Sequence, residues 1–486
     1  MCSCRHRWPW RLLQQLKRLS GLDCRRGSWV FGHWAQFWSN LTTTSMSGWC
    51  YDSGMTHNTV SVDRYLPQES DLAMARSLSP VMADMQGSKI LGIASQVRQL
   101  QAQGREICNL TVGDFRPGRF PIPEALSEQV SIAYGQGQTN YPPADGVPEL
   151  KEAIAGLYKR EMGLDYGSDS VCVGSGARPP LYASWRLLTK PGDVTVSFLP
   201  SWNMGYYAHF CQTDHRFVPT TADNNFFPTP DQVSKAIVRA RMLLINSPLN
   251  PTGTAISADV LEGIARAIVD ENKRRGSDPP VMLVYDQVYW MLTANGVQHH
   301  NPVQLVPEVA PFVINIDAIS KCFAATGLRV GWGVMPRFIQ PKMRALIGHM
   351  GAWPARPEQL ATAWLLNHPE VMHQYMGEMK QRVADRLDLL FNGVMEMKAA
   401  GLPVDAIAPQ GAIYLTLNVD LIGRGFDSNE GIRHYLLEEA GVAVVPFQAF
   451  DMPEETGWFR MSVGAVSCDE LDDALGRIQK AIRAKI

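Results

Sequence analysis

From Ser88 onward, short runs of apolar and β-branched residues alternate with longer stretches of helical periodicity. Ser257 stands where a helix N-cap is expected, before a helical pattern that ends near Arg275. The alternation predicts an α/β fold with a mostly parallel sheet between two layers of helices, in which ligands bind at the carboxyl ends of the strands. The strands predicted for this sheet are 170–173, 194–199, 241–246, 281–285 and 312–316.

A different order of elements is predicted for the C-terminal part of the chain. Helical patterns continue from Arg356 to Ala400, and a closing helix ends the chain. Between them lie strand-like runs at 412–419, 442–445 and 458–463. This order predicts a smaller α+β domain. The expected divisions are a leader at 1–84, an arm of the smaller domain at 85–125, a large domain at 126–355 and the smaller domain at 356–486.

Residues 1–50 differ in composition from the rest of the chain. They hold seven Lys or Arg against one acid, Asp23, together with six of the thirteen tryptophans. An Arg-rich, acid-poor N-terminus is typical of an organelle transit segment. The other interpretation is an untidy extension before a true start at Met46, Met74, Met82 or Met85. We expect a cytoplasmic protein, or one of an organelle matrix if this segment is a transit peptide.

The overall composition excludes several classes of function. The 486 residues are 45% hydrophobic, which is enough for a sizeable core, and the net charge of −2 argues against a general nucleic-acid binder. No apolar run is long enough to span a bilayer. The nine cysteines are odd in number and scattered, which indicates free thiols. Cys2 and Cys4 lack a second ligand pair at zinc spacing, so no metal site is predicted.

Four polar clusters accompany the predicted strands. Each alone has a simple explanation, such as a turn for an Asn-Pro-Thr-Gly sequence or a solvated side chain for a lysine. Their order and spacing favour one shared site, and we expect them to converge from four strand ends on one crevice. The clusters are Asn246-Ser-Pro-Leu-Asn250-Pro-Thr-Gly-Thr254, Asp286-Gln-Val-Tyr289, Asp317-Ala-Ile-Ser320-Lys321 and Gly327-Leu-Arg329-Val-Gly-Trp332.

Together these clusters resemble the pyridoxal-phosphate-dependent aminotransferases of class I/II, the aspartate aminotransferase superfamily of fold type I. The resemblance covers roughly residues 88–486. It implies that Lys321 is the Schiff-base lysine and that Asp286 faces the pyridine nitrogen of pyridoxal 5′-phosphate. It also implies that Asn250 and Tyr289 bind the 3′-oxygen of the cofactor, and that Arg329 binds its phosphate.

The resemblance extends to further cofactor and substrate contacts. Gly176-Ala177-Arg178 would hold the phosphate at a helix N-terminus, where Ser320 is a second contact, and Trp202 would stack on the pyridine ring. Tyr141 would reach the phosphate of the other subunit in an obligate homodimer. Arg460 would bind the α-carboxylate of the substrate, and the backbone of Gly113 would close over it.

Two positions depart from the family pattern. Ala318 stands where many relatives have a phosphate-binding serine, although Ser320 remains. Arg178 stands where some aspartate and prephenate aminotransferases carry a lysine that recognises a distal carboxylate. Arg178 would then favour a dicarboxylate; the alternative is that it pairs with a local acid or with the phosphate. Arg116 and Arg119, near the expected entrance, are further candidates for contact with an acidic substrate.

The resemblance implies an aminotransferase that moves an amino group between an L-amino acid and a 2-oxo acid, with aspartate or glutamate favoured as donor. The same fold and cofactor also serve β-lyases and synthases, which are therefore an alternative. A non-enzymatic regulator is a third possibility, because some bacterial regulators fuse this fold to a DNA-binding helix-turn-helix. Residues 1–84 show no winged-helix pattern, and no nucleic-acid or membrane partner is expected.

Overall fold

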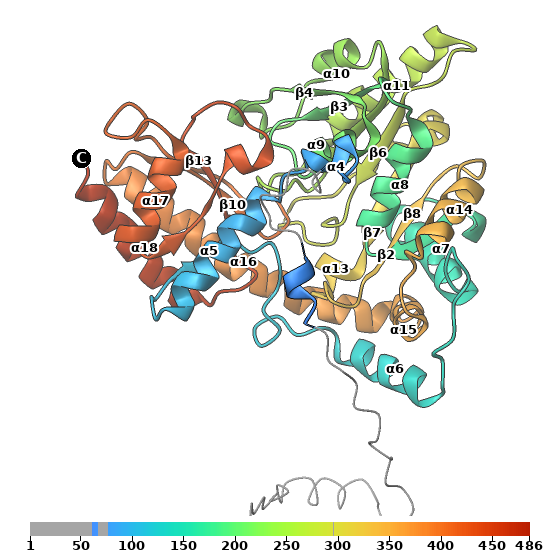
Figure 1. Cartoon of the computed structure of the whole chain (residues 1–486), viewed down its shortest axis with the longest axis horizontal. Helices are drawn as coiled ribbons and strands as arrows, with labels where there is room; N and C mark the ends of the chain where they lie inside the picture. The colour runs from blue at the N-terminus through green and yellow to red at the C-terminus, as the bar shows by residue number, and fades with distance from the viewer. Residues whose placement is uncertain (1–60, 67–75, 295) are drawn as a thin grey trace, which may run out of the picture. The chain divides into compact units, whose positions relative to one another are not determined.

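The computed structural model describes residues 61–66, 76–294 and 296–486 (Figure 1). The chain divides into two units, residues 1–77 and 78–486. In the first unit, the described residues form one 3₁₀ turn, η1 (Asp63–Tyr65). The transit segment or extension predicted at 1–50 lies outside the described residues. The second unit holds all the other described helices and strands.

A seven-stranded sheet forms the centre of the second unit, and its α/β class confirms the prediction. The strand order is β2-β8-β7-β6-β5-β3-β4, and only β8 runs antiparallel to its neighbours. The strands are β2 (Val171–Ser175), β3 (Val194–Phe198), β4 (Asp214–Val218), β5 (Ala240–Asn246), β6 (Met282–Asp286), β7 (Val313–Ala318) and β8 (Val330–Val334).

Helices bury both faces of this sheet, so its central strands are mostly apolar. Along β5, Met242 and Leu244 belong to one core cluster, whereas Leu243 and Ile245 belong to the other. The first face is covered by α8 (Arg178–Leu188), α9 (Met204–Cys211) and α14 (Gln340–Met350). The second is covered by α7 (Pro148–Met162), α10 (Pro230–Ala236) and α11 (Ala258–Arg275), with Ser257 as the predicted N-cap of α11.

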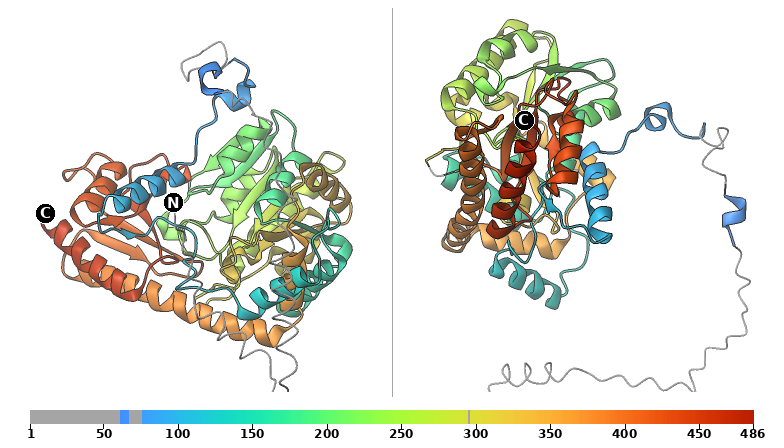
Figure 2. Two further views of the ribbon diagram at one scale, coloured as in Figure 1. Left: turned by 60° about the horizontal axis from the view of Figure 1, so that its bottom comes forward. Right: turned by 90° about the vertical axis from the view of Figure 1, so that its left-hand side faces the viewer.

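The C-terminal part of the chain forms a second, antiparallel sheet of four strands. Its order is β12-β13-β10-β9. Figure 2 shows α16 as a single long orange helix, which packs on β9, β10 and α18. The elements are α16 (Pro369–Ala399), β9 (Val404–Ile407), β10 (Tyr414–Val419), α17 (Asn429–Glu439), β12 (Val445–Pro446), β13 (Trp458–Ser462) and α18 (Cys468–Arg483).

The arm before the large sheet packs against the C-terminal part of the chain. Strand β1 (Cys108–Asn109) pairs in parallel with β11 (Val442–Ala443). Val97 of α5 (Lys89–Ala102) is fully buried in a small cluster with Leu437 and Ala443. The single strand predicted at 442–445 is therefore wrong, because the chain changes sheets at Val444 and continues as β12.

Two further helices of the second unit pack together. Helix α15 (Arg356–Leu366) packs on α6 (Glu124–Gly135) and on α7. The domain boundaries expected after residues 125 and 355 stay predictions.

No described helix combines the length and apolar character that crossing a membrane requires. The short helices are α4 (Pro80–Ala83), α12 (Pro302–Leu305), α13 (Ile319–Cys322), η2 (Ser168–Ser170), η3 (Ala222–Asn224), η4 (Pro307–Phe312) and η5 (Phe447–Phe450).

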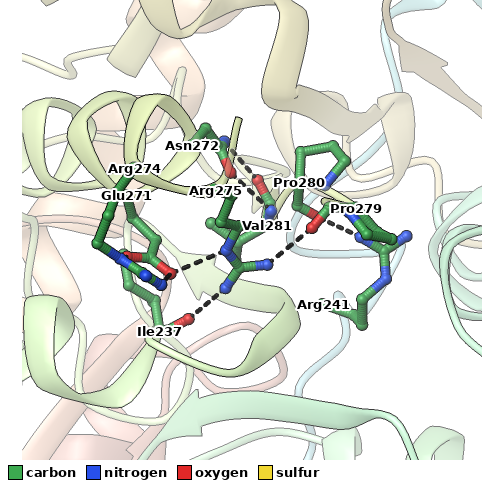
Figure 3. Close-up of polar contacts among 9 residues, drawn as sticks. All are labelled: Ile237, Arg241, Glu271, Asn272, Arg274, Arg275, Pro279, Pro280 and Val281. Carbon is green, nitrogen blue, oxygen red and sulfur yellow. Dashed lines mark hydrogen bonds and ion pairs between the residues drawn. The ribbon is translucent and has the colours of Figure 1, made fainter. Parts of the chain in front are cut away.

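A polar network fixes the C-terminal end of α11 to the start of β6 (Figure 3). The Asn272 side chain donates to the carbonyl oxygen of Val281 at 2.9 Å and accepts from its N–H at 2.8 Å. Arg275 donates to Glu271 at 2.8 Å and to the carbonyl oxygen of Ile237 at 2.7 Å. Because the two backbone groups of Val281 lie directly before the first residue of β6, the network helps to set the position of β6 in the sheet.

We expect Asn272→Ala to destabilise the protein by about 2–4 kcal/mol, because both backbone groups of Val281 would be buried without partners. Urea unfolding of the purified variant measures this loss. Arg274→Ala is the matched control, since its ion pair with Glu271 lies on the same helix but the Arg274 side chain is 60% exposed. That control should leave the free energy of unfolding nearly unchanged, because water screens an exposed ion pair. Equal losses of unfolding free energy in both variants would contradict the role given to Asn272.

Candidate active site

The carboxyl ends of β5 and β6 lie side by side at one edge of the large sheet, where Asn246 pairs with Asp286. The expectation that all four polar clusters follow a strand is wrong for the fourth, because Arg329 precedes β8. Strand β8 runs in the opposite direction, and its first residue, Val330, pairs with Ser175 at the end of β2. The reversed direction of β8 therefore still brings Arg329 to this edge.

A cavity of about 670 Å³ opens at this edge, a volume typical of sites for small organic ligands. It collects most of the residues that the sequence singles out. Of the cofactor and substrate contacts that the resemblance implies, Gly176 and Tyr141 do not line it. Tyr141 is 84% exposed and meets Trp353 edge to face. The predicted residues that line the cavity are Gly113, Ala177, Arg178, Trp202, Asn250, Asp286, Tyr289, Ser320, Lys321, Arg329 and Arg460.

Lys321 lies on α13, a single turn of helix that follows β7. Its Nζ donates to the carbonyl oxygen of Gly113 at 2.5 Å. Burial lowers the pKa of Lys321 to about 8; Asp114 raises this pKa, and Arg460 lowers it. A lysine with this pKa has a substantial neutral fraction near pH 7–8, so its amine can act as a nucleophile or a base.

Asp286 is the last residue of β6 and is only 5% exposed. Its Oδ1 accepts a hydrogen bond from the backbone N–H of Val288 at 3.3 Å. Burial raises the pKa of Asp286 to about 7, although the Val288 N–H and the charge of Lys321 act in the opposite direction. A cation placed beside this carboxyl would favour its ionised form.

The turn between β2 and α8 packs closely against the residues before β8. Arg329, at a left-handed φ of 57°, donates to the carbonyl oxygens of Thr326 at 2.6 Å and Ser175 at 3.2 Å. A Cβ at Gly176 would collide with the guanidinium of Arg329. Helix α8 begins at Arg178, two residues later. A guanidinium beside a helix N-terminus favours an anion such as a phosphate.

Arg460 is a fully buried cation, 1% exposed, on β13. Its Nη1 donates to Oδ1 of Asn250 at 3.0 Å, and its Nη2 donates to the carbonyl oxygen of Thr111 at 2.6 Å. In the described part of the chain, no carboxylate pairs with Arg460 and its Nε has no hydrogen-bond partner. A buried guanidinium without a carboxylate is costly, so the arrangement favours a carboxylate supplied by a ligand.

Residues 105–478 match the family described as aminotransferase class I and II. The chain belongs to this family. An aspartate/prephenate aminotransferase of Thermus thermophilus is 30% identical over 412 residues, which cover 84% of this chain and 99% of the relative. An aspartate aminotransferase of Bacillus sp. strain YM-2 is 28% identical over 401 residues, covering 82% and 96%. The protein is thus an aminotransferase.

Solved structures agree with this assignment. The aspartate aminotransferase of Rhizobium meliloti superposes with a TM-score of 0.76 at 28% identity, over 84% of this chain and 98% of that one. The aspartate aminotransferase of Thermus thermophilus with maleate superposes with a TM-score of 0.75, also at 28% identity, over 83% and 99%. Nearly the whole length of these two enzymes is therefore matched by this aminotransferase.

Sequence reasoning missed two residues that build the site of the aminotransferase, Tyr414 and Asn246. Tyr414 lines the cavity, and its hydroxyl lies 2.6 Å from that of Tyr289. Asn246 donates to the carbonyl oxygen of Asp286 at 3.0 Å and accepts from the N–H of Asn250 at 2.9 Å. Asn246 stood within a predicted cluster and could have been singled out, whereas Tyr414 carried no signal beyond an apolar strand pattern.

The candidate specificity arginines lie in different surroundings. Arg178 is exposed and lines the cavity, with its guanidinium carbon 4.7 Å from the centre of the Trp202 ring. Arg119 pairs with Glu470 at 3.1 Å. Neither Arg119 nor Arg116 is among the residues that line the cavity. Only Arg178, of the three, is in place to meet a ligand there.

The pKa of Asp286 predicts a pH-dependent effect of Asp286→Asn on the stability of the cofactor-free protein. Folded Asp286 keeps its proton up to about pH 7, whereas the unfolded chain releases it near 3.8. Rising pH therefore destabilises the wild type across this window, and the asparagine avoids that loss. We expect the variant's gain in Tm to grow between pH 4 and pH 7 and to level off above. Differential scanning fluorimetry measures it, with the exposed Asp427→Asn as control; a gain independent of pH would contradict the raised pKa.

Proposed function

We propose that this aminotransferase uses pyridoxal 5′-phosphate to move the amino group of an acidic amino acid, such as aspartate or glutamate, to a 2-oxo acid. The observation that carries the proposal is Arg460, a buried guanidinium without a carboxylate partner in the described chain, in the same cavity as Lys321 and Asp286. The site thus combines an anion receptor, an amine and an acid of shifted pKa.

The residues of the cavity fit the chemical groups of pyridoxal 5′-phosphate. Lys321 offers an amine for the aldehyde, and Asp286 offers a buried carboxyl for the ring nitrogen. Arg329 and the N–H groups at the start of α8 offer a cationic cradle for the phosphate. When bound, the cofactor supplies an electron sink for the electrons that are left on the substrate Cα.

Lys321 and Asp286 would divide the proton chemistry between them. The amine of Lys321, with its lowered pKa, would take the proton from the substrate Cα. It would then give this proton to the carbon of the cofactor that receives the amino group. Asp286 would hold the ring nitrogen in its protonated form, since an ionised carboxylate at this buried position requires an adjacent cation. Tyr289 and Asn250 would hydrogen-bond to the oxygen on the ring.

Substrate recognition would rest on two arginines. Arg460 would bind the α-carboxylate of the amino acid, with the backbone of Gly113 closing over it. Arg178 would bind the distal carboxylate, since it is exposed to the cavity and forms no ion pair in the described part of the chain. The relatives named above are aspartate and aspartate/prephenate aminotransferases, which supports an acidic substrate.

The first test follows the visible absorbance of the purified protein loaded with pyridoxal 5′-phosphate. We expect aspartate or glutamate alone, without any oxo acid, to remove the visible band, because the amino group passes to the cofactor in the first half-reaction. Arg178→Leu should lower kcat/KM for aspartate about 10- to 100-fold, the range for one charged hydrogen-bonding partner. It should leave kcat/KM for alanine within about twofold.

Arg116→Leu is the matched control, because this exposed arginine does not line the cavity. It should leave both substrates unaffected. A band removed only by aromatic or aliphatic donors would overturn the acidic substrate class and leave the aminotransferase assignment. Release of the amino group as ammonia, with no change of the band, would favour a β-lyase. A protein that forms no visible band with the cofactor would overturn the role of Lys321.

A homodimer with shared sites is part of the proposal. Tyr141 is 84% exposed, and other large apolar side chains are exposed nearby in the sequence: Ile132 and Tyr134 on α6. Such exposure of large apolar side chains is typical of a contact surface. The hydroxyl of Tyr141 would then reach the phosphate in the site of the second copy.

We expect sedimentation velocity to show two chains per particle at micromolar concentration. Tyr141→Phe should keep that mass but need about tenfold more pyridoxal 5′-phosphate for half-saturation, because one hydrogen bond to the phosphate is lost. The measurement is a cofactor titration of the apoprotein, with Tyr65→Phe, outside the second unit, as control. A fully active monomer would contradict the shared site.

A further inference from the structure

Tyr414 is held rigidly at the point where the second sheet meets the loop after β5. It is the first residue of β10 and is 1% exposed. A Cβ at Gly253 would collide with the Tyr414 carbonyl, so the two backbones are in direct contact. Two residues further on, the hydroxyl of Thr416 donates to the carbonyl oxygen of Thr252 at 2.8 Å. The side chain of Tyr414 therefore starts from a backbone that has little freedom to move.

The hydroxyl of Tyr414 has one hydrogen-bond partner in the described chain, the hydroxyl of Tyr289. The two oxygens are 2.6 Å apart, and the ring centres are 5.7 Å apart. A Cβ at Gly113 would lie 2.8 Å from the Tyr414 hydroxyl, so only glycine leaves room for it there. A phenol can make three hydrogen bonds, so Tyr289 can hold Tyr414 and still bind a ligand oxygen.

The ring of Tyr414 supports the guanidinium of Arg460. The guanidinium carbon lies 4.7 Å from the ring centre, and the ring of Phe450 lies at 5.0 Å. Burial away from water strengthens such a cation–π contact. Tyr414 is therefore in contact with Arg460, the proposed carboxylate receptor, through its ring and with Tyr289 through its hydroxyl.

We propose that Tyr414 is a positioning residue that couples Arg460 to Tyr289, so that the carboxylate receptor and the Tyr289 hydroxyl keep a fixed relative position. The inference deepens the proposed function and rests on it. Its ring orients the guanidinium, and its hydroxyl orients the phenol of Tyr289. Burial raises the pKa of both tyrosines, so the bond between them is one between two neutral hydroxyls.

Two variants of Tyr414 separate the ring from the hydroxyl. Tyr414→Phe keeps the ring under Arg460 and removes only the bond to Tyr289. We expect its kcat with aspartate to fall about tenfold, while KM and the Kd of succinate stay within about twofold. Tyr414→Leu also removes the ring, and the Kd of succinate should rise about tenfold. Succinate binding is measured by calorimetry on the loaded enzyme.

Tyr289→Phe removes the same hydrogen bond from its other end. If Tyr414 acts through Tyr289, the double variant Tyr289→Phe/Tyr414→Phe will have the same kcat as Tyr289→Phe alone. The pH dependence of the absorbance of bound pyridoxal 5′-phosphate is a second readout. We expect its apparent pKa to shift in the same direction in Tyr414→Phe and in Tyr289→Phe, because both change the phenol that faces the cofactor.

Three results would overturn the inference alone, in a wild type that responds to aspartate. These are a Tyr414→Phe variant with unchanged kcat and absorbance, kcat losses that multiply in the double variant, and an unchanged Kd of succinate in a folded Tyr414→Leu. A variant that only melts at lower temperature, with the other readouts unchanged, would show a merely structural role. A wild type whose band no amino acid removes would overturn the proposed function and this inference together.

Discussion

The burial of one guanidinium without a carboxylate is the constraint on which the rest of the site depends. Arg460 cannot be solvated, so every neighbour that it has must compensate for the water that it lost. Four separate parts of the chain do so: Thr111 from the arm, Asn250 from the loop after β5, Tyr414 from β10 and Phe450 from η5. These parts meet because each contacts the same cation. The described part of the chain provides neutral acceptors for Arg460 but no carboxylate.

Several positively charged side chains lie in the cavity together with Arg460. Arg178, Arg329 and Arg460 all line the cavity with Lys321. Their charges add to burial in keeping the pKa of Lys321 near 8. Burial also raises the pKa of Asp286 to about 7, so both groups exchange protons within the pH range in which most enzymes work. The cavity is therefore prepared for anionic ligands and for proton transfer at the same time.

Most residues of this cavity could be predicted from the sequence, because their residue types and their positions near strand ends indicate a shared site. Lys321, Asp286 and Asn250 each lie at the end of, or shortly after, an apolar run that predicts a buried strand, and parallel strands end together. Arg329 was placed correctly for a wrong reason, since the direction of β8 depends on pairing with β2 and β7 and leaves no local trace. Tyr414 could not be found, because an aromatic residue in a strand usually belongs to a core.

Longer-range arrangement was also beyond the sequence. The division of 442–446 between two sheets depends on which strands lie nearby, and the apolar pattern is the same in either case. Strand β4 was missed because it lies at the sheet edge and carries alternating exposed positions, such as Asp214 and Arg216. Edge strands lose the continuous apolar run that marks the central ones.

The change of sheets at Val444 has a mechanical consequence. Helix α5 contributes Ile90, Ala94 and Arg98 to the wall of the cavity. The same helix is tied through β1 to β11, and β11 continues after one residue into β12 of the C-terminal sheet. A connection of one residue leaves β11 and β12 little freedom to move relative to each other. Any rotation of the C-terminal sheet would therefore carry this wall with it, so the width of the cavity mouth and the orientation of that sheet are a single degree of freedom.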